Sequence, residues 1–135
     1  MVKLEWKKNM NFIAHTPSAH EVHIDSSKES GGDDTAARPM EMLLISLGGC
    51  TAMDVISILK KMRALPDNFH VEIDYERAPI HPKIYTRIHL RYIFTNAPSP
   101  EKAQKAVELS QNKYCSVSAM LKKASNLTYE LVFES

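Results

Sequence analysis

The sequence predicts an α+β fold in which antiparallel strands surround one long central helix. Three stretches near the N-terminus, residues 2–8, 11–16 and 20–26, show the partial apolar-polar alternation that is typical of half-buried strands. A long apolar segment from Pro39 to about Arg63 has instead the length and composition of a buried helix. Because no repeat and no linker interrupts the order of elements, we expect a single domain over residues 1–135.

The long helix is expected to begin at Pro39, since proline lacks an N–H group and the first helical turn leaves that group unbonded. Glu41 in the first turn suits the positive end of the helix dipole. The helix should end before Pro66, which cannot continue it. The preceding segment 27–37, SKESGGDDTAA, is small, polar and glycine-containing, so we expect a mobile loop that leads into the helix.

The C-terminal half predicts two strands, two helices and a closing strand. The second strand alternates apolar with charged residues, which indicates one buried and one solvated face. Ser99 followed by Pro100 is typical of an N-cap and a first helical residue, and the helix that they begin should run to the second cysteine. The expected ranges are 69–78, 84–94, 100–114, 116–124 and 126–134.

The apolar segment 42–59 approaches the length of a membrane span. Asp54 near its centre would cost about 2.5–3.5 kcal/mol on insertion, and no second span is present to accept its carboxylate. We therefore expect a helix covered by protein. A helix that is apolar on nearly every face has more surface than one small sheet covers, so self-association is expected.

Composition excludes some classes of partner. The 135 residues include 44% hydrophobic and 24% charged residues, as in ordinary globular proteins. A net charge of +1 provides no electrostatic footprint for nucleic acid or for an anionic membrane. The first residues, MVKLEWKKNMNF, lack the apolar core of a secretory signal, so a cytoplasmic location is expected. In that compartment a cysteine pair is more often catalytic or redox-sensing than structural.

The two cysteines, Cys50 and Cys115, each lie where a helix is expected to begin or bend. A thiol near a helix N-terminus meets free N–H groups and the positive end of the dipole, which favour the thiolate. If the fold brings both thiols together, one can attack an oxidant and the other can resolve the product as a disulfide. The alternative is that both are small buried hydrophobic residues, the usual state of a free cysteine.

Residues beside Cys50 have competing interpretations. Gly48 and Gly49 each cost the helix about 1 kcal/mol relative to alanine, so something must compensate. Either they let a substrate or another backbone approach the sulfur, or they allow close helix packing. Asp54 lies one turn after Cys50 on the same face and would raise the thiol pKa unless a cation pairs with it. We interpret Asp54 as an interface or supporting residue rather than as an activator.

Two segments carry a family resemblance. The strings RPMEMLLISLGGCTAMDVISILKKMR and YCSVSAMLKKA resemble the OsmC/Ohr family of thiol-dependent hydroperoxide reductases, and most closely its shorter, YhfA-like members. In that family a Pro-x-Glu helix start precedes the reactive cysteine by nine residues, counted from the glutamate, and a second cysteine opens a later helix. The order of elements agrees along nearly the whole chain. The matching residues here are Pro39, Glu41, Cys50 and Cys115.

The resemblance implies an OsmC-like fold, an intertwined homodimer, and a peroxidase cycle. In this cycle the Cys50 thiolate attacks a hydroperoxide, Cys115 forms a disulfide with the product, and an external dithiol or lipoyl-type reductant reopens it. The family peroxidases also use an arginine that pairs with the glutamate and the thiolate. Residues 1–37 contain no arginine, so Arg38 is the candidate for that charge.

Glu41 does not reach Cys50 along a straight helix. Nine residues put the two on opposite faces and about 13 Å apart along the axis. The resemblance therefore implies that Glu41 serves Cys50 of the partner subunit or orients an arginine there. Without the resemblance, Glu41 is better interpreted as an acidic residue at the positive end of the helix dipole.

Other chemistries have less support. His15, His20 and His23 are possible metal ligands, but the spacing of the last two puts them on opposite strand faces, and no Cys-x-x-Cys accompanies them. We therefore expect no metal and no cofactor. Two functions remain: a cysteine-dependent peroxidase, and a non-catalytic dimer that binds a small apolar or thiol-containing ligand. Apolar neighbours favour organic hydroperoxides as substrates, namely Met40, Leu43, Leu44, Leu47 and Met53.

Overall fold

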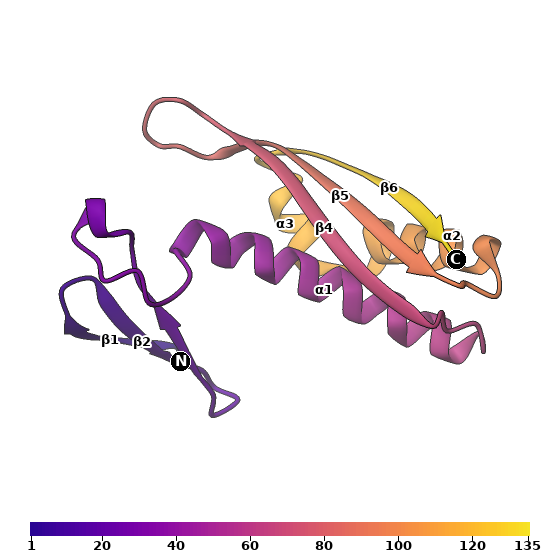
Figure 1. Cartoon of the computed structure of the whole chain (residues 1–135), viewed down its shortest axis with the longest axis horizontal. Coiled ribbons are helices and arrows are strands. Elements are labelled where there is room, and N and C mark those ends of the chain that lie inside the picture. Colours follow the sequence, from indigo (N-terminus) through magenta and orange to yellow (C-terminus); the bar gives the residue numbers. More distant parts are fainter. The chain divides into compact units, whose positions relative to one another are not determined.

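The computed structural model describes all of residues 1–135. The chain divides into two compact units, residues 1–45 and 46–135, and each is described by itself. Strands, a long helix, two strands, shorter helices and a last strand follow one another, which confirms the predicted α+β class (Figure 1). The prediction of a single domain stays a prediction.

The first unit holds a three-stranded antiparallel sheet in the order β1-β2-β3. Its strands are β1 (Lys3–Lys8), β2 (Asn11–His15) and β3 (Glu21–Ile24), close to the predicted ranges. The helix α1 (Pro39–Lys61) begins in this unit at the predicted proline and continues into the second unit. The N-terminal meander expected from the alternation of residues is thus present.

The segment between β3 and α1, expected to be a mobile loop, is folded around one carboxylate. Asp25 is 1% exposed, and it accepts hydrogen bonds from the backbone N–H groups of Ser26, Asp33 and Thr35. The Thr35 hydroxyl donates a further one at 2.7 Å. These bonds, the Thr35 hydroxyl first, hold the pKa of Asp25 at about 2. At Gly32 a Cβ would lie 2.2 Å from the Ser26 carbonyl oxygen, so the turn needs glycine there.

The second unit holds the sheet β4-β5-β6. Its strands are β4 (Asn68–Arg77), β5 (Tyr85–Thr95) and β6 (Asn126–Glu134). β4 and β5 pair antiparallel as predicted, but β6 runs parallel to β5, which corrects the expectation of antiparallel sheets. The reason is the connection between β5 and β6: its helices form a crossover that returns the chain to the end where β5 began.

That crossover contains α2 (Pro100–Leu109), the single π-helical turn η2 (Ser110–Tyr114) and α3 (Ser116–Leu121). Ser99 is the N-cap of α2 as predicted, and its hydroxyl accepts the N–H of Lys102 at 3.2 Å. The helix does not continue regularly to the second cysteine as expected, because η2 widens its last turn.

From Ser46 onward, α1 lies along one face of the β4-β5-β6 sheet (Figure 1). The residues that α1 buries recur every four positions, as one helical face requires. They are Leu47, Thr51, Val55 and Leu59, and none is more than 1% exposed. The sheet contributes four fully buried residues of β5 to the same core: Ile88, Leu90, Tyr92 and Phe94.

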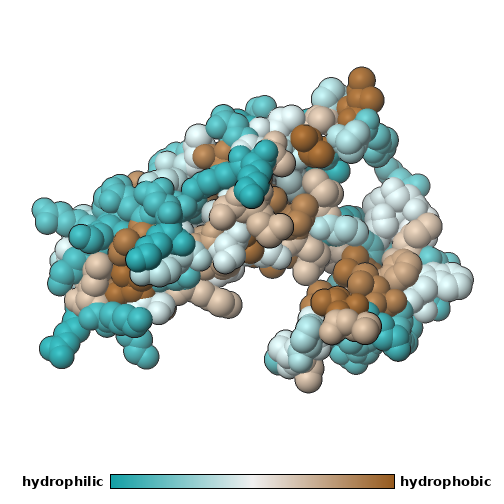
Figure 2. Space-filling view, turned by 180° about the vertical axis from the view of Figure 1, so that it is seen from behind, coloured by the Kyte–Doolittle hydropathy of each residue, from teal (hydrophilic) through white to brown (hydrophobic).

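By length and mean hydropathy, 1.9 over its most apolar window, α1 would also be able to cross a membrane. Only 28% of that window is buried within the chain, on the face that packs against the sheet, so a single chain does not cover the helix as expected. Other apolar side chains of α1 remain at the surface: Met53 is 75% exposed and Ile56 is 37% exposed. Figure 2 shows that apolar side chains reach the surface over both units.

Candidate active site

Cys50 lies near the middle of α1, half-buried. The helix continues through it, so the backbone N–H groups around the sulfur are used within the helix. The prediction that Cys50 marks a helix start or bend is therefore wrong, because the helix accommodates both preceding glycines. A Cβ at Gly48 would lie 3.1 Å from Cδ1 of Ile73, which supports close packing there. A Cβ at Gly49 would meet nothing within 4 Å, so no packing contact requires glycine at that position.

Cys115 is the N-cap of α3, so this cysteine does open a helix as predicted. Its side chain is 3% exposed. The Ser118 hydroxyl donates to Sγ at 3.1 Å, and the Ser118 backbone N–H donates at 3.4 Å. Burial raises the pKa of the Cys115 thiol and the adjacent Cys50 raises it further, while the bonds from Ser118 oppose this shift.

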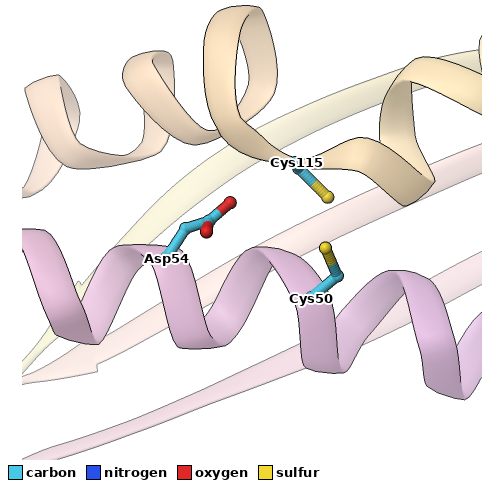
Figure 3. A group of neighbouring side chains, drawn as sticks. All are labelled: Cys50, Asp54 and Cys115. Atoms are coloured by element: carbon cyan, nitrogen blue, oxygen red, sulfur yellow. The ribbon is translucent and has the colours of Figure 1, made fainter. Parts of the chain in front are cut away.

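The two sulfurs meet. Figure 3 shows Cys50 on α1 and Cys115 in the turn before α3, with their side chains directed toward each other. Both sulfurs and a carboxylate oxygen of Asp54 lie within 4.8 Å of one another. Elements far apart in the sequence thus bring together the two cysteines on which the predicted thiol chemistry depends.

Asp54 is the third member of this group. From the sequence we interpreted it as an interface or supporting residue. It stands one helical turn after Cys50, and this spacing was the available signal. Asp54 forms no ion pair, so no paired cation offsets its effect on the neighbouring thiol. Instead its carboxylate accepts a hydrogen bond from the Ser110 hydroxyl at 2.9 Å.

A row of buried hydrogen bonds ends at this carboxylate. Because a carboxylate only accepts, Ser110 must donate to Asp54, and the Ser110 oxygen then accepts from Thr51 at 2.7 Å. By the same reasoning Thr51 accepts from Tyr92 at 2.6 Å, and Tyr92 accepts from the Gln111 amide at 2.7 Å. The chemistry of Asp54 therefore fixes the direction of every hydroxyl in the row.

The far end of the row is also buried. Burial raises the pKa of Tyr92 to about 12, although its bonds to Thr51 and Gln111 act in the opposite direction. The side-chain amide oxygen of Gln111 has no partner, whereas its backbone oxygen accepts from the Lys122 ammonium at 2.6 Å. The π-helical turn buries both residues that the crossover contributes to this row: Ser110, which donates to Asp54, and Gln111, which donates to Tyr92.

Arg38 and Glu41 lie in the first unit. The Arg38 guanidinium pairs with Asp34 at 2.7 Å, and Glu41 accepts the Arg38 backbone N–H at 2.9 Å. Glu41 thus satisfies a free N–H at the start of α1, which is the interpretation favoured without the resemblance. The predicted roles of both residues at a thiolate stay predictions.

The histidines considered as metal ligands do not form a three-ligand group. His15 lies near Glu5 at 3.4 Å and near Glu21 at 3.8 Å, while Nδ1 of His20 is 3.0 Å from the Ser18 hydroxyl. The group that does have metal-ligand geometry consists of Cys50, Asp54 and Cys115. These three residues differ from the histidines that the sequence suggested as possible metal ligands.

Comparisons with known proteins identify the family of the chain. The OsmC-like protein family matches residues 31–130. Protein YhfA of Escherichia coli strain K12 is 40% identical over 133 residues, which cover 96% of each chain. A hypothetical protein from Aquifex aeolicus VF5 has a crystal structure with a TM-score of 0.82 and 33% identity, over 100% of this chain and 97% of that one.

More distant structures share the fold alone. The organic hydroperoxide resistance protein OsmC of Legionella pneumophila has a TM-score of 0.72 at 11% identity, over 98% of this chain and 95% of that one. The predicted OsmC/Ohr resemblance, with its YhfA-like character, is therefore confirmed by sequence and by structure. The chain belongs to the OsmC-like family.

Proposed function

We propose that this chain is a thiol-dependent peroxidase that reduces organic hydroperoxides, with Cys50 as the attacking residue and Cys115 as the resolving residue. The observation that carries the proposal is the approach of the two sulfurs to within 4.8 Å, from helix α1 and from the N-cap of α3. A disulfide needs an S–S bond of about 2.05 Å, so only a small movement separates the reduced pair from the bridge. Cys50 is the more exposed of the two, as an attacking thiol should be.

In the first step the Cys50 thiolate attacks the distal oxygen of ROOH. An S–O bond forms, the O–O bond breaks, and the RO⁻ group leaves and takes a proton to become the alcohol. The sulfur is oxidised by two electrons to a sulfenic acid. The partial exposure of Cys50 supports access of a substrate to this sulfur.

In the second step the Cys115 thiolate attacks the sulfur of the sulfenic acid. The S–S bond forms, the S–O bond breaks, and hydroxide leaves and takes a proton to become water. The hydrogen bonds from Ser118 support this step, because they favour the thiolate at a buried position. An external dithiol or lipoyl-type reductant then supplies two electrons and reopens the bridge.

The proposal includes Arg38 as the cation that stabilises the thiolate, and Glu41 as the carboxylate that orients this cation. For Arg38 to stabilise a thiolate and a departing oxyanion, its guanidinium must exchange Asp34 for the sulfur. Asp34→Asn should then ease this exchange. We expect it to raise the rate with hydroperoxide, whereas Arg38→Ala should lower the rate.

We also propose that the protein works as a homodimer in the cytoplasm. Met53 and Ile56 of α1 are apolar and exposed, and with Ala52 they line a shallow groove on that helix. Covering such a surface with a second copy would remove it from water.

A second candidate function is a non-catalytic dimer that binds a small apolar or thiol-containing ligand. One observation favours it: Asp54 presents a carboxylate without a cation next to both sulfurs, which opposes thiolate formation. Under this candidate both thiols remain protonated and reduced when peroxide is added.

The test is a thiol titration after one equivalent of cumene hydroperoxide is added to reduced protein, with mass spectrometry to locate any disulfide. We expect wild type to lose both thiols into a Cys50–Cys115 bridge. Cys50→Ser should stay reduced, and Cys115→Ser should stop at a sulfenic or over-oxidised Cys50. Two thiols that remain reduced in wild type would support the ligand-binding candidate instead.

A further inference from the structure

The reduced site gathers three groups that carry negative charge when deprotonated, and no ion pair joins any of them to a cation of the chain; Lys61 lines a groove with Asp54 without pairing with it. The two sulfurs and the Asp54 oxygen lie within 4.8 Å of one another, and Asp54 has no ion-pair partner. Like charges at such distances repel strongly when partly buried. A cation bound between them would remove this repulsion.

The chemistry of the three groups selects the kind of cation. Two thiolates and one carboxylate are a donor set that borderline and soft divalent metals prefer, and Zn²⁺ takes Cys sulfur at about 2.3 Å and carboxylate oxygen at about 2.0–2.2 Å. Tetrahedral coordination at those lengths separates neighbouring ligand atoms by roughly 3.5–4 Å. The three ligand atoms lie within 4.8 Å of one another, so no separation exceeds this range by more than about 1 Å.

The surrounding bonds would hold two of the ligands in place. The Ser110 hydroxyl donates to one Asp54 oxygen and leaves the other free, and the directed row behind Ser110 keeps it in that orientation. The Ser118 hydroxyl and N–H donate to the Cys115 sulfur. Bonds from such outer groups to metal ligands are typical of metal sites, where they fix ligand orientation.

We propose that reduced Cys50, Asp54 and Cys115 bind one divalent metal ion of the Zn²⁺ class, with a fourth position left for water. Binding releases the two thiol protons and forms two metal–sulfur bonds. A disulfide between the same two sulfurs cannot bind the metal. A hydroperoxide would oxidise the two thiolates to this disulfide, take up two protons, and be reduced to ROH and water, so the cation would be released. Metal binding itself does not require the peroxidase reaction, but this release rests on the proposed function.

The experiment uses full-length, metal-free, reduced protein and the metals alone. Cd²⁺ reports thiolate ligation by its ultraviolet charge-transfer band, and Zn²⁺ affinity is measured by competition with a chromophoric chelator. We expect one metal per chain in wild type. Cys50→Ser and Cys115→Ser should each abolish the Cd²⁺ charge-transfer band that arises when both thiolates bind one ion. Asp54→Asn should weaken Zn²⁺ binding about 10-fold or more.

Asp74→Asn is the matched control, because Asp74 is an exposed aspartate on β4 that pairs with Arg87. It should bind like wild type. Circular dichroism melts of every variant separate lost ligands from lost folding, and Asp54→Glu, which keeps a carboxylate, should retain more affinity than Asp54→Asn. Substoichiometric binding by folded wild type, or equal affinity of the Asp54→Asn and Asp74→Asn variants, would overturn the three-ligand site.

This result can be separated from the proposed function. Peroxide consumption is measured on metal-free protein and metal binding on protein that never meets peroxide. Turnover without metal binding would reject the metal site alone, and metal binding without turnover would reject only the peroxidase. If both hold, adding Zn²⁺ should slow disulfide formation, and peroxide should then release the metal to the chelator.

Discussion

Replacing Tyr92 by phenylalanine tests the buried row of hydrogen bonds that ends at Asp54. The change keeps the ring in the core and removes only the hydroxyl. Gln111 then loses the acceptor of its 2.7 Å bond and keeps only a 3.4 Å contact with Thr51. Thr51 loses the donor that lies at 2.6 Å.

The expected cost follows from these lost partners. A buried polar group left without its hydrogen bond costs about 1–3 kcal/mol. For a chain of this length such a loss lowers the Tm by about 3–12 °C. Tyr75→Phe is the matched control, since Tyr75 is 43% exposed and its hydroxyl makes no hydrogen bond within the chain; it should leave the free energy of unfolding nearly unchanged.

The pH dependence adds a second readout. The pKa of Tyr92 is about 12 in the folded chain, against an ordinary value of 10.0. The folded state therefore holds the Tyr92 proton more tightly than the unfolded state. The stabilisation that results is complete below pH 10 and is lost as the pH rises through 12. The two-unit difference corresponds to roughly 3 kcal/mol. Tyr92→Phe lacks this loss, so the stability gap to wild type should narrow from pH 10 to pH 12.

The assay is urea unfolding of wild type and both variants at pH 7 and at several values between 9.5 and 12. If Tyr92→Phe is as stable as Tyr75→Phe at pH 7, the row contributes nothing and our account of it is wrong. A gap that stays constant up to pH 12 would show instead that the hydroxyl titrates as an exposed tyrosine does.

Three further predictions concern other parts of the chain. Asp25→Asn should destabilise the first unit at neutral pH. The pKa of Asp25 is about 2 in the folded chain against an ordinary value of 3.8, so in an acid unfolding series the difference in stability between wild type and variant should shrink as the pH falls from 3.8 toward 2. Gly49→Ala should stabilise α1 by up to about 1 kcal/mol in thermal melts, because its Cβ meets no other atom within 4 Å; an unchanged or lower Tm would contradict this reasoning. Met53→Asp places a charge on an apolar side chain that is 75% exposed and lines the groove on α1, so it should shift the proposed dimer to monomer in sedimentation; Lys123→Asp, at an exposed position outside that groove, should not.

Features set by local chemistry were predictable from the sequence. Pro39 begins α1 and Ser99 caps α2, because both signals act within one helical turn. The apolar alternation along β5 also predicted the burial of Ile88, Leu90, Tyr92 and Phe94, whereas Tyr85 and Ile93, which it placed on the other face, are buried too. The two cysteines, which drew attention through their sequence neighbours, do lie together.

Features set by distant partners were not predictable. The parallel pairing of β6 depends on how the crossover packs, and no residue of β6 encodes its direction. The close approach of Gly48 to Ile73 joins α1 to a strand far along the chain, and no local signal identifies that strand residue. The spacing from Cys50 placed Asp54 on the right face, but its hydrogen bond from Ser110 joins residues 56 positions apart, and no spacing rule identifies such a partner.

The π-helical turn Ser110–Tyr114 makes the meeting of the two sulfurs a matter of chain length as well as of side-chain chemistry. Such a turn arises when one residue is added to an α-helix, and each residue turns the following chain by about 100°. Deleting a single position between α2 and Cys115 would point the sulfur away from Cys50 even though every functional side chain were kept. Relatives that differ by one residue in this turn would therefore be expected to differ in thiol chemistry, whatever their percentage identity.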